Sequence, residues 1–140
     1  MVLHPAQAYS IIFLTGGFVY CGIEIIYRGF SHISMFLAGG ICFLLIGWVE
    51  RTSGTDASLI AQMFCCALII TAVEFVFGII VNRQMHLNVW DYSQEQYNFM
   101  GQICLLNSCL WFLLSCPAIY LNDLLQHWLL GVPLFHHNFF

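Results

Sequence analysis

The sequence predicts an all-α membrane protein in which four transmembrane helices form an up-down bundle. Of its 140 residues, 61% are hydrophobic and 7% are charged, whereas soluble domains carry about 25% charged residues. Four apolar runs, separated by polar stretches, each approach the roughly 20 residues that a helix needs to cross a bilayer. The mean hydropathy is +0.85. So few charges cannot cover a water-facing surface, so we expect a single integral membrane domain over residues 1–140.

The spans are expected at residues 8–27, 33–49, 59–81 and 102–121. The connection at residues 29–34 is very short, which makes the first two spans an antiparallel hairpin. Asp56 or Ser58 is expected to cap the third span, because both side chains accept hydrogen bonds from a first helical turn. Residues 122–130 are expected to form a short amphipathic helix at the C-terminal end, lying in the interface and stopped by Gly131.

The first two spans are rich in glycine, and small residues let helices approach closely in a membrane. These glycines are Gly16, Gly17, Gly22, Gly39, Gly40 and Gly47. The close contacts are expected either within the subunit or between copies, and we expect a homo-oligomer, with a dimer favoured. The bilayer is the expected surrounding, and another membrane subunit is a possible partner. Three arginines and no lysine exclude a basic nucleic-acid surface.

The seven cysteines lie inside the apolar runs and show no CxxC or Cys/His spacing. They are expected to be reduced packing residues, so no metal, disulfide framework or cofactor is predicted.

Two carboxylates in the apolar runs are the main candidates for a site. Glu24 and Arg28 are four residues apart and can meet on one helix face. They form either a self-neutralising pair at the interface or a site in which Glu24 points into the bundle. Glu74 lies about 12 Å along the helix axis from Asn82. At that depth a carboxylate must pair, take a proton or face water. Glu74 therefore either serves packing or lines an ion or proton route.

Four antiparallel spans place the first and third connections on the same side of the membrane. We therefore expect one cluster of pathway residues there, formed by Glu24, Arg28, Glu74, Asn82, Arg83 and Asn107. The opposite half offers mainly Gln62 and the Glu50–Arg51 turn. Arg28 and Arg83 outnumber Arg51, which favours the cytoplasm for the first side.

The stretch from Arg83 to Gly101 is too polar to cross the membrane and rich in aromatic residues. It is expected to lie among the headgroups or to fold back over the bundle as a lid or a rigid connector. Its principal residues are Trp90, Asp91, Tyr92 and Asn98. A turn is expected in which Asp91 or Ser93 bonds the following backbone.

These residues also carry a family resemblance. The VEF around Glu74, WDYS at residues 90–93, Asn98, and GQICLLNSCLW at residues 101–111 resemble the bacterial membrane family labelled putative ABC-transporter type IV, or CmpB-like putative ABC transporter permeases. Phe75 stands where the family usually has Tyr, and Gln102 takes a place that is often basic. The resemblance implies a small multi-pass protein of the bacterial inner membrane. The chain has no GxxxxGK[ST] phosphate loop, so it would be a membrane subunit and not the ATPase.

The sequence thus favours a transport or channel component that passes a small ion or solute without its own ATPase. The alternative is a non-transporting scaffold or accessory subunit whose polar cluster is structural. A conduit needs a hydrated route through the half near Gln62, whereas a scaffold can be dry. An intramembrane enzyme ranks below both, because no nucleophile–base pair or metal set is evident, and we expect no enzyme activity.

Overall fold

The computed structural model describes residues 2–53 and 57–140. It contains four long helices, α1 (Pro5–Arg28), α2 (Ile33–Ser53), α3 (Leu59–Gly78) and α4 (Leu105–Leu130). All four are long and apolar enough to cross a membrane. A π-helical segment, η1 (Ile79–Gln84), extends α3, and two short strands, β1 (Asn98–Phe99) and β2 (Ile103–Cys104), form a hairpin before α4. The predicted all-α membrane fold is confirmed.

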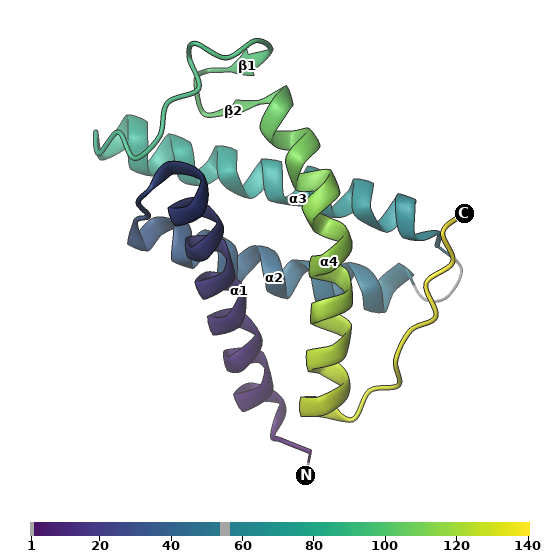
Figure 1. The fold of residues 1–140 in the computed structure, drawn as a ribbon. Coiled ribbons are helices and arrows are strands. Elements are labelled where there is room, and N and C mark those ends of the chain that lie inside the picture. The colour runs from purple at the N-terminus through teal and green to yellow at the C-terminus, as the bar shows by residue number, and fades with distance from the viewer. Residues whose placement is uncertain (1, 54–56) are drawn as a thin grey trace.

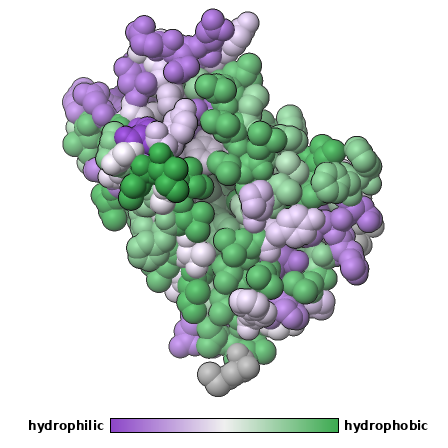
Figure 2. Space-filling view, in the orientation of Figure 1, coloured by the Kyte–Doolittle hydropathy of each residue, from purple (hydrophilic) through white to green (hydrophobic). Residues whose placement is uncertain are grey.

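The helices alternate in direction along the chain (Figure 1). In this view α1 and α4 run beside each other, and α2 and α3 cross behind them. We call the end with the α1–α2 connection and the hairpin the loop end, and the end with the chain termini the tail end. Figure 2 shows that hydrophobic residues cover most of this face and that hydrophilic residues gather over the loop above it.

The helix ends follow from local chemistry. Pro5 takes the first position of α1, where its missing N–H is not needed, and the His4 ring accepts a hydrogen bond from the Ala6 N–H. Gly29 ends α1 with φ 83°, a conformation that suits a residue without Cβ. Ser58 caps α3 by accepting from the Ala61 N–H at 3.3 Å, as expected. The other predicted cap, Asp56, lies outside the described residues.

Glycines set the close contact between α1 and α2. A Cβ on Gly16 would overlap the Phe43 side chain and approach the Gly39 carbonyl oxygen to 2.7 Å. On Gly40 it would meet the Phe13 ring at 2.5 Å. A Cβ on Gly22, by contrast, would meet nothing within 4 Å. Most of the predicted small-residue contact is therefore made inside the subunit.

The first three spans differ from the prediction by at most four residues at either end, with η1 counted as part of the third, and the fourth helix differs in two respects. The fourth helix begins at Leu105 and not at residue 102, because Gln102 lies between β1 and β2, with its N–H bonded to the Phe99 carbonyl. Residues 122–130 are helical, but they are the last turns of α4 and not a separate interfacial helix. The reason is that Asn122 has a partner in the bundle: its Nδ2 donates to the Phe43 carbonyl of α2 at 2.6 Å.

Candidate functional site

The loop end of the bundle holds the first of two buried polar clusters. Glu24 of α1 is buried and forms an ion pair with Arg28, as the four-residue spacing predicts. Arg28 also donates from Nη1 to the Val89 carbonyl at 3.0 Å, which ties the end of α1 to the returning loop. Because Glu24 is only 4% exposed, the pair lies inside the protein and not at an open interface.

Glu74 of α3 is 3% exposed and is held by donors from two other parts of the chain. Its Oε1 accepts from the Tyr92 hydroxyl at 3.2 Å, and its Oε2 accepts from the Trp111 ring N–H at 3.1 Å. The Tyr92 oxygen in turn accepts from Asn107 Nδ2. One carboxylate thus connects α3, the loop and α4. We call Glu24, Arg28, Glu74, Tyr92, Asn107 and Trp111 the loop-side cluster.

The Tyr92 hydroxyl keeps its proton in this setting. Burial raises the pKa of Tyr92 well above its usual range, and the nearby carboxyl groups of Glu74 and Glu24 raise it further. The hydroxyl is therefore a donor to Glu74 at any physiological pH. Its position also shows that Glu24 and Glu74, far apart in sequence, lie near the same group.

A second network fixes the loop beside this cluster. Asn82 of η1 is buried, and its Nδ2 donates to the Trp90 carbonyl and to Gln102 Oε1, both at 3.0 Å. Its Oδ1 accepts from the Val89 N–H at 2.7 Å. The Trp90 ring N–H donates to the Gln102 carbonyl at 2.9 Å. All polar atoms of the Asn82 side chain are thus used to hold the loop over the end of α3.

The exposed part of the loop is built from local turns. Asp91 Oδ1 accepts from the Ser93 N–H at 2.8 Å, which is the predicted turn. This backbone bond, with a side-chain bond from Ser93, lowers the pKa of Asp91. Asn98 donates to the Glu95 carbonyl at 2.8 Å and accepts from the Gly101 N–H at 3.1 Å. Gly101 has φ 69°, so a side chain there would be strained.

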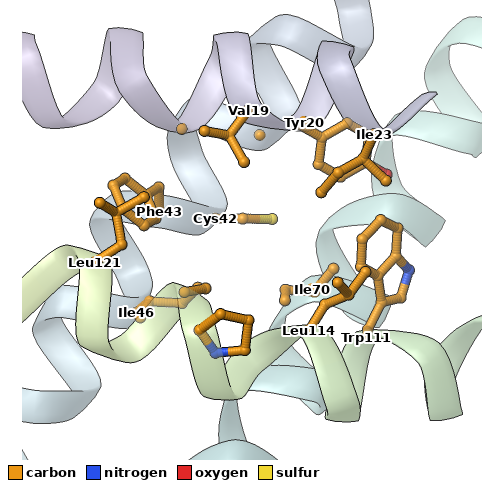
Figure 3. Close-up of a pocket in the computed structure, with 14 residues that line it drawn as sticks. Val19, Tyr20, Ile23, Cys42, Phe43, Ile46, Ile70, Trp111, Leu114 and Leu121 are labelled. Atoms are coloured by element: carbon orange, nitrogen blue, oxygen red, sulfur yellow. The ribbon is translucent and has the colours of Figure 1, made fainter. Parts of the chain in front are cut away.

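A cavity of about 250 Å³ lies between α1 and α4, with α2 and α3 behind it (Figure 3). Its lining is almost entirely apolar. Tyr20 and Trp111 stand at one end with their ring centroids 5.1 Å apart, and Phe43, Ile46 and Leu121 stand at the other. Trp111 borders the cavity and also bonds Glu74, so the loop-side cluster adjoins one end of an apolar space.

The tail end holds a second cluster of polar residues, and the sequence did not indicate that these residues meet. Glu50 of α2 and Asp123 of α4 are 1% and 4% exposed. Gln126 Nε2 donates to Asn122 Oδ1 at 2.6 Å and lies 3.4 Å from Glu50 Oε2. His137 of the C-terminal segment reaches the two carboxylates. We call Glu50, Asn122, Asp123, Gln126 and His137 the tail-side cluster.

The structure therefore brings together four of the six predicted pathway residues, Glu24, Arg28, Glu74 and Asn107. Asn82 lies in the adjoining network that holds the loop. Arg83 is exposed on η1, and among the described residues it has no ion pair. Of the predicted loop residues, Trp90 and Tyr92 face the bundle, while Asp91 and Asn98 organise the exposed turn.

Two contributors were not predicted, Trp111 and the tail-side cluster. Trp111 had no distinguishing pattern, since it lies in an apolar run. Gln102 was expected as a polar group on this side, but in a helix and not in the turn between β1 and β2. The tail-side cluster had a partial signal, because Asn122 and Gln126 are four residues apart and share a helix face. Polar residues thus occupy both ends of the bundle, and the expectation of one polar half is corrected.

The fold and these clusters define a class, a small multi-pass α-helical membrane protein with buried carboxylates at both ends of the bundle. The sequence model of the family described as Putative ABC-transporter type IV matches residues 7–138, and the chain belongs to this family. No curated protein and no solved structure matches the chain significantly.

Proposed function

We propose that this protein is the membrane component of a transport system in the bacterial cell membrane, and that it binds an amphipathic organic cation between α1 and α4. The observation that carries the proposal is the apolar cavity of about 250 Å³ that adjoins the loop-side cluster. The apolar body of the solute would fill the cavity, and its cationic group would lie at the end formed by Tyr20 and Trp111. The family description supports a transport role in general terms.

Charge and aromatic character favour a cation at that end. The loop-side cluster contains the carboxyl groups of Glu24 and Glu74 and one guanidinium, that of Arg28. Acidic groups therefore outnumber basic ones. The stacked rings of Tyr20 and Trp111 present aromatic surface, and a cation near such a ring gains about 0.5–2 kcal/mol.

An inorganic ion fits this space poorly. An unpaired charge in apolar surroundings costs several kcal/mol, and the middle of the cavity offers no polar side chain to offset that cost. Gln62, the residue expected on a hydrated route, is 3% exposed, donates to the Ala57 carbonyl at 3.1 Å and does not line the cavity. The proposal is therefore solute transport and not simple ion conduction.

The helix most suited to move is α4. Pro117 lies inside it and lines the cavity, and a proline removes one helical hydrogen bond and clashes with the preceding turn. Bending at Pro117 would change the width of the space between α1 and α4. The chain has no phosphate loop, so the energy comes from an ion gradient or a partner ATPase. A homodimer or another membrane subunit would supply further helices, and no catalysis is assigned to the chain.

The test uses the aromatic cation N-methylquinolinium and two matched variants. Ala118→Trp places a large ring on the cavity wall, whereas Ala72→Trp places the same ring on the exposed face of α3. Binding to the purified protein is followed by quenching of tryptophan fluorescence, and flux is measured in liposomes. We expect saturable binding to native protein and to Ala72→Trp, and at least tenfold weaker binding to Ala118→Trp. Equal binding by both variants would refute the cavity as the binding place.

A specific observation favours a second function, a non-transporting scaffold or accessory subunit. Both oxygens of Glu74 accept hydrogen bonds from other elements, and the amide of Asn82 is fully used. Such a satisfied network fastens helices without lining a route. The two functions differ in Glu74→Gln: a scaffold loses stability only, whereas a transporter also loses affinity for the cation in protein that is still folded.

A further inference from the structure

The C-terminal segment, residues 131–140, crosses the tail end of the bundle from the end of α4 to the start of α3 (Figure 1). We call it the strap. The Leu59 N–H donates to the Asn138 carbonyl at 2.7 Å. The Phe135 N–H lies 3.2 Å from Asp123 Oδ2 and 3.4 Å from Oδ1. The strap is thus attached at α3 by one backbone bond and at α4 by a bond to a carboxylate. Near its start, the Val132 carbonyl also lies 2.8 Å from Nδ1 of His127 on α4.

Between these attachments His137 enters the bundle. Its Nε2 lies 3.9 Å from Glu50 Oε1 and 3.9 Å from Asp123 Oδ2. The three side chains are 2%, 0% and 6% exposed. Both ring nitrogens and Glu50 Oε1 are buried and have no hydrogen-bond partner among the described residues. An imidazole so placed faces two carboxyl groups while its own nitrogens remain unsatisfied.

The groups around His137 come from three helices. Glu50 lies on α2, with the Cys66 thiol of α3 near it. Asp123 and Tyr120 lie on α4, and the Tyr120 ring meets the imidazole edge-on at 5.0 Å.

Arg51, the residue that follows Glu50, is engaged elsewhere. Arg51 donates from Nε to Gln126 Oε1 at 2.6 Å and from Nη1 to the Tyr9 hydroxyl. Among the described residues, His137 is therefore the only basic side chain recorded within 4.0 Å of the Glu50 and Asp123 carboxylates.

We propose that Glu50, Asp123 and His137 form a buried proton-binding site, and that a proton on His137 holds the strap against the bundle. With the proton, the imidazolium lies between two carboxylates and compensates their charge. Without it, two acidic groups would share a buried site with no cation within 4.0 Å among the described residues, which is costly. Loss of the proton therefore releases the strap and uncovers the tail-side cluster.

Linkage gives the sign and the size of the effect. If the docked strap binds one proton more than the released strap, docking weakens as the pH rises. The limit is about tenfold per pH unit, in the range where the released strap has lost the proton that the docked strap still holds. Docking should be strongest below that range and should decline through pH 7 and 8.

The experiment measures amide hydrogen exchange of the full chain in nanodiscs between pH 6 and pH 9. The two reporters are the Leu59 N–H, which is bonded to the strap, and the Phe135 N–H, which belongs to the strap and is bonded to Asp123. The protection factor is the intrinsic exchange rate at a given pH divided by the measured rate at that pH. It therefore reports docking and not the pH dependence of exchange itself. His137→Gln removes the titrating ring, and His136→Gln, next to it on the exposed side of the strap, is the matched control.

For native protein and His136→Gln we expect the protection factors of both amides to fall several-fold per pH unit above pH 7. In His137→Gln the fall should be clearly smaller than in native protein, because only the two carboxyl groups can then bind the proton. Glu50→Gln should also show a reduced slope in protein that is folded. Flat protection in the native protein would overturn the proposal, and so would an unchanged slope in His137→Gln. A slope that disappears with EDTA would also overturn it, because a metal ion and not a proton would then fill the site.

Discussion

The bond between Tyr92 and Glu74 provides a direct test of how the loop is held to the bundle. Tyr92→Phe deletes one hydroxyl and keeps the ring. The deletion removes the donor 3.2 Å from Glu74 Oε1 and leaves Asn107 Nδ2 without its acceptor. A hydrogen bond to a charged group contributes about 1.5–3 kcal/mol, and a buried donor without a partner costs about 1–3 kcal/mol. Because the two losses overlap at one oxygen, we expect a net destabilisation of about 2–4 kcal/mol.

The matched control is Tyr97→Phe, which deletes the same hydroxyl from the same loop at a residue that is 79% exposed. Surface changes of this kind stay within about 0.5 kcal/mol. Unfolding is followed in mixed micelles by the reactivity of the buried thiols of Cys42, Cys66 and Cys104. If Tyr92→Phe and Tyr97→Phe unfold at the same mole fraction of denaturing detergent in the micelles, the reasoning is refuted. In that case the Tyr92 hydroxyl does not hold the loop to Glu74.

Two further predictions concern the helix contact and the loop. Gly16→Ala should cost about 1–3 kcal/mol, because the new Cβ would overlap the Phe43 side chain. Gly22→Ala, where a Cβ meets nothing within 4 Å, should be neutral or stabilise by up to about 1 kcal/mol. Thermal unfolding in detergent compares the two variants. Equal losses of stability would contradict the packing argument. The second prediction concerns Asp91, whose pKa is lower in the folded protein than in the unfolded chain. The stabilisation that its turn gives is therefore fully present above the pKa of the unfolded chain, and it is lost as the pH falls through the pKa of the folded protein. Exchange of the Ser93 N–H should therefore be protected at pH 6 and lose protection below about pH 4, whereas Asp91→Asn should remove this pH dependence; an unchanged profile in the variant would count against it.

The fold was predictable because lipid imposes a strong and local constraint. Every backbone group inside hydrocarbon must be bonded within its own helix, so apolar runs of sufficient length become helices. Both ends of α1 and the start of α3 follow from Pro5, Gly29 and Ser58, which act on neighbouring residues. The end of the last helix was not predictable in the same way. Its polar turns resemble an interfacial helix until the partner of Asn122 on α2 is known.

The candidate site was predictable only where its contacts are local. Glu24 and Arg28 are four residues apart, and the spacing alone places them together. The donors to Glu74 come from 18 and 37 residues further along the chain, and no pattern in the sequence specifies which hydroxyl or ring N–H arrives there. The tail-side cluster needs α2, α4 and the strap together, so none of these segments reveals it alone.

The apolar cavity lies beside the contacts that hold the helices together. Inside a bilayer there is little hydrophobic force between helices, so close packing and hydrogen bonds hold them together. In this protein the glycines join α1 to α2, and the polar clusters join the helices at the loop end and at the tail end. The apolar cavity lies between α1 and α4, and two of the glycines that join α1 to α2, Gly16 and Gly39, form part of its wall. A substitution in a cluster or at these glycines should therefore reduce stability, whereas one elsewhere on the cavity wall, such as at Ala118, should change binding with a smaller effect on stability.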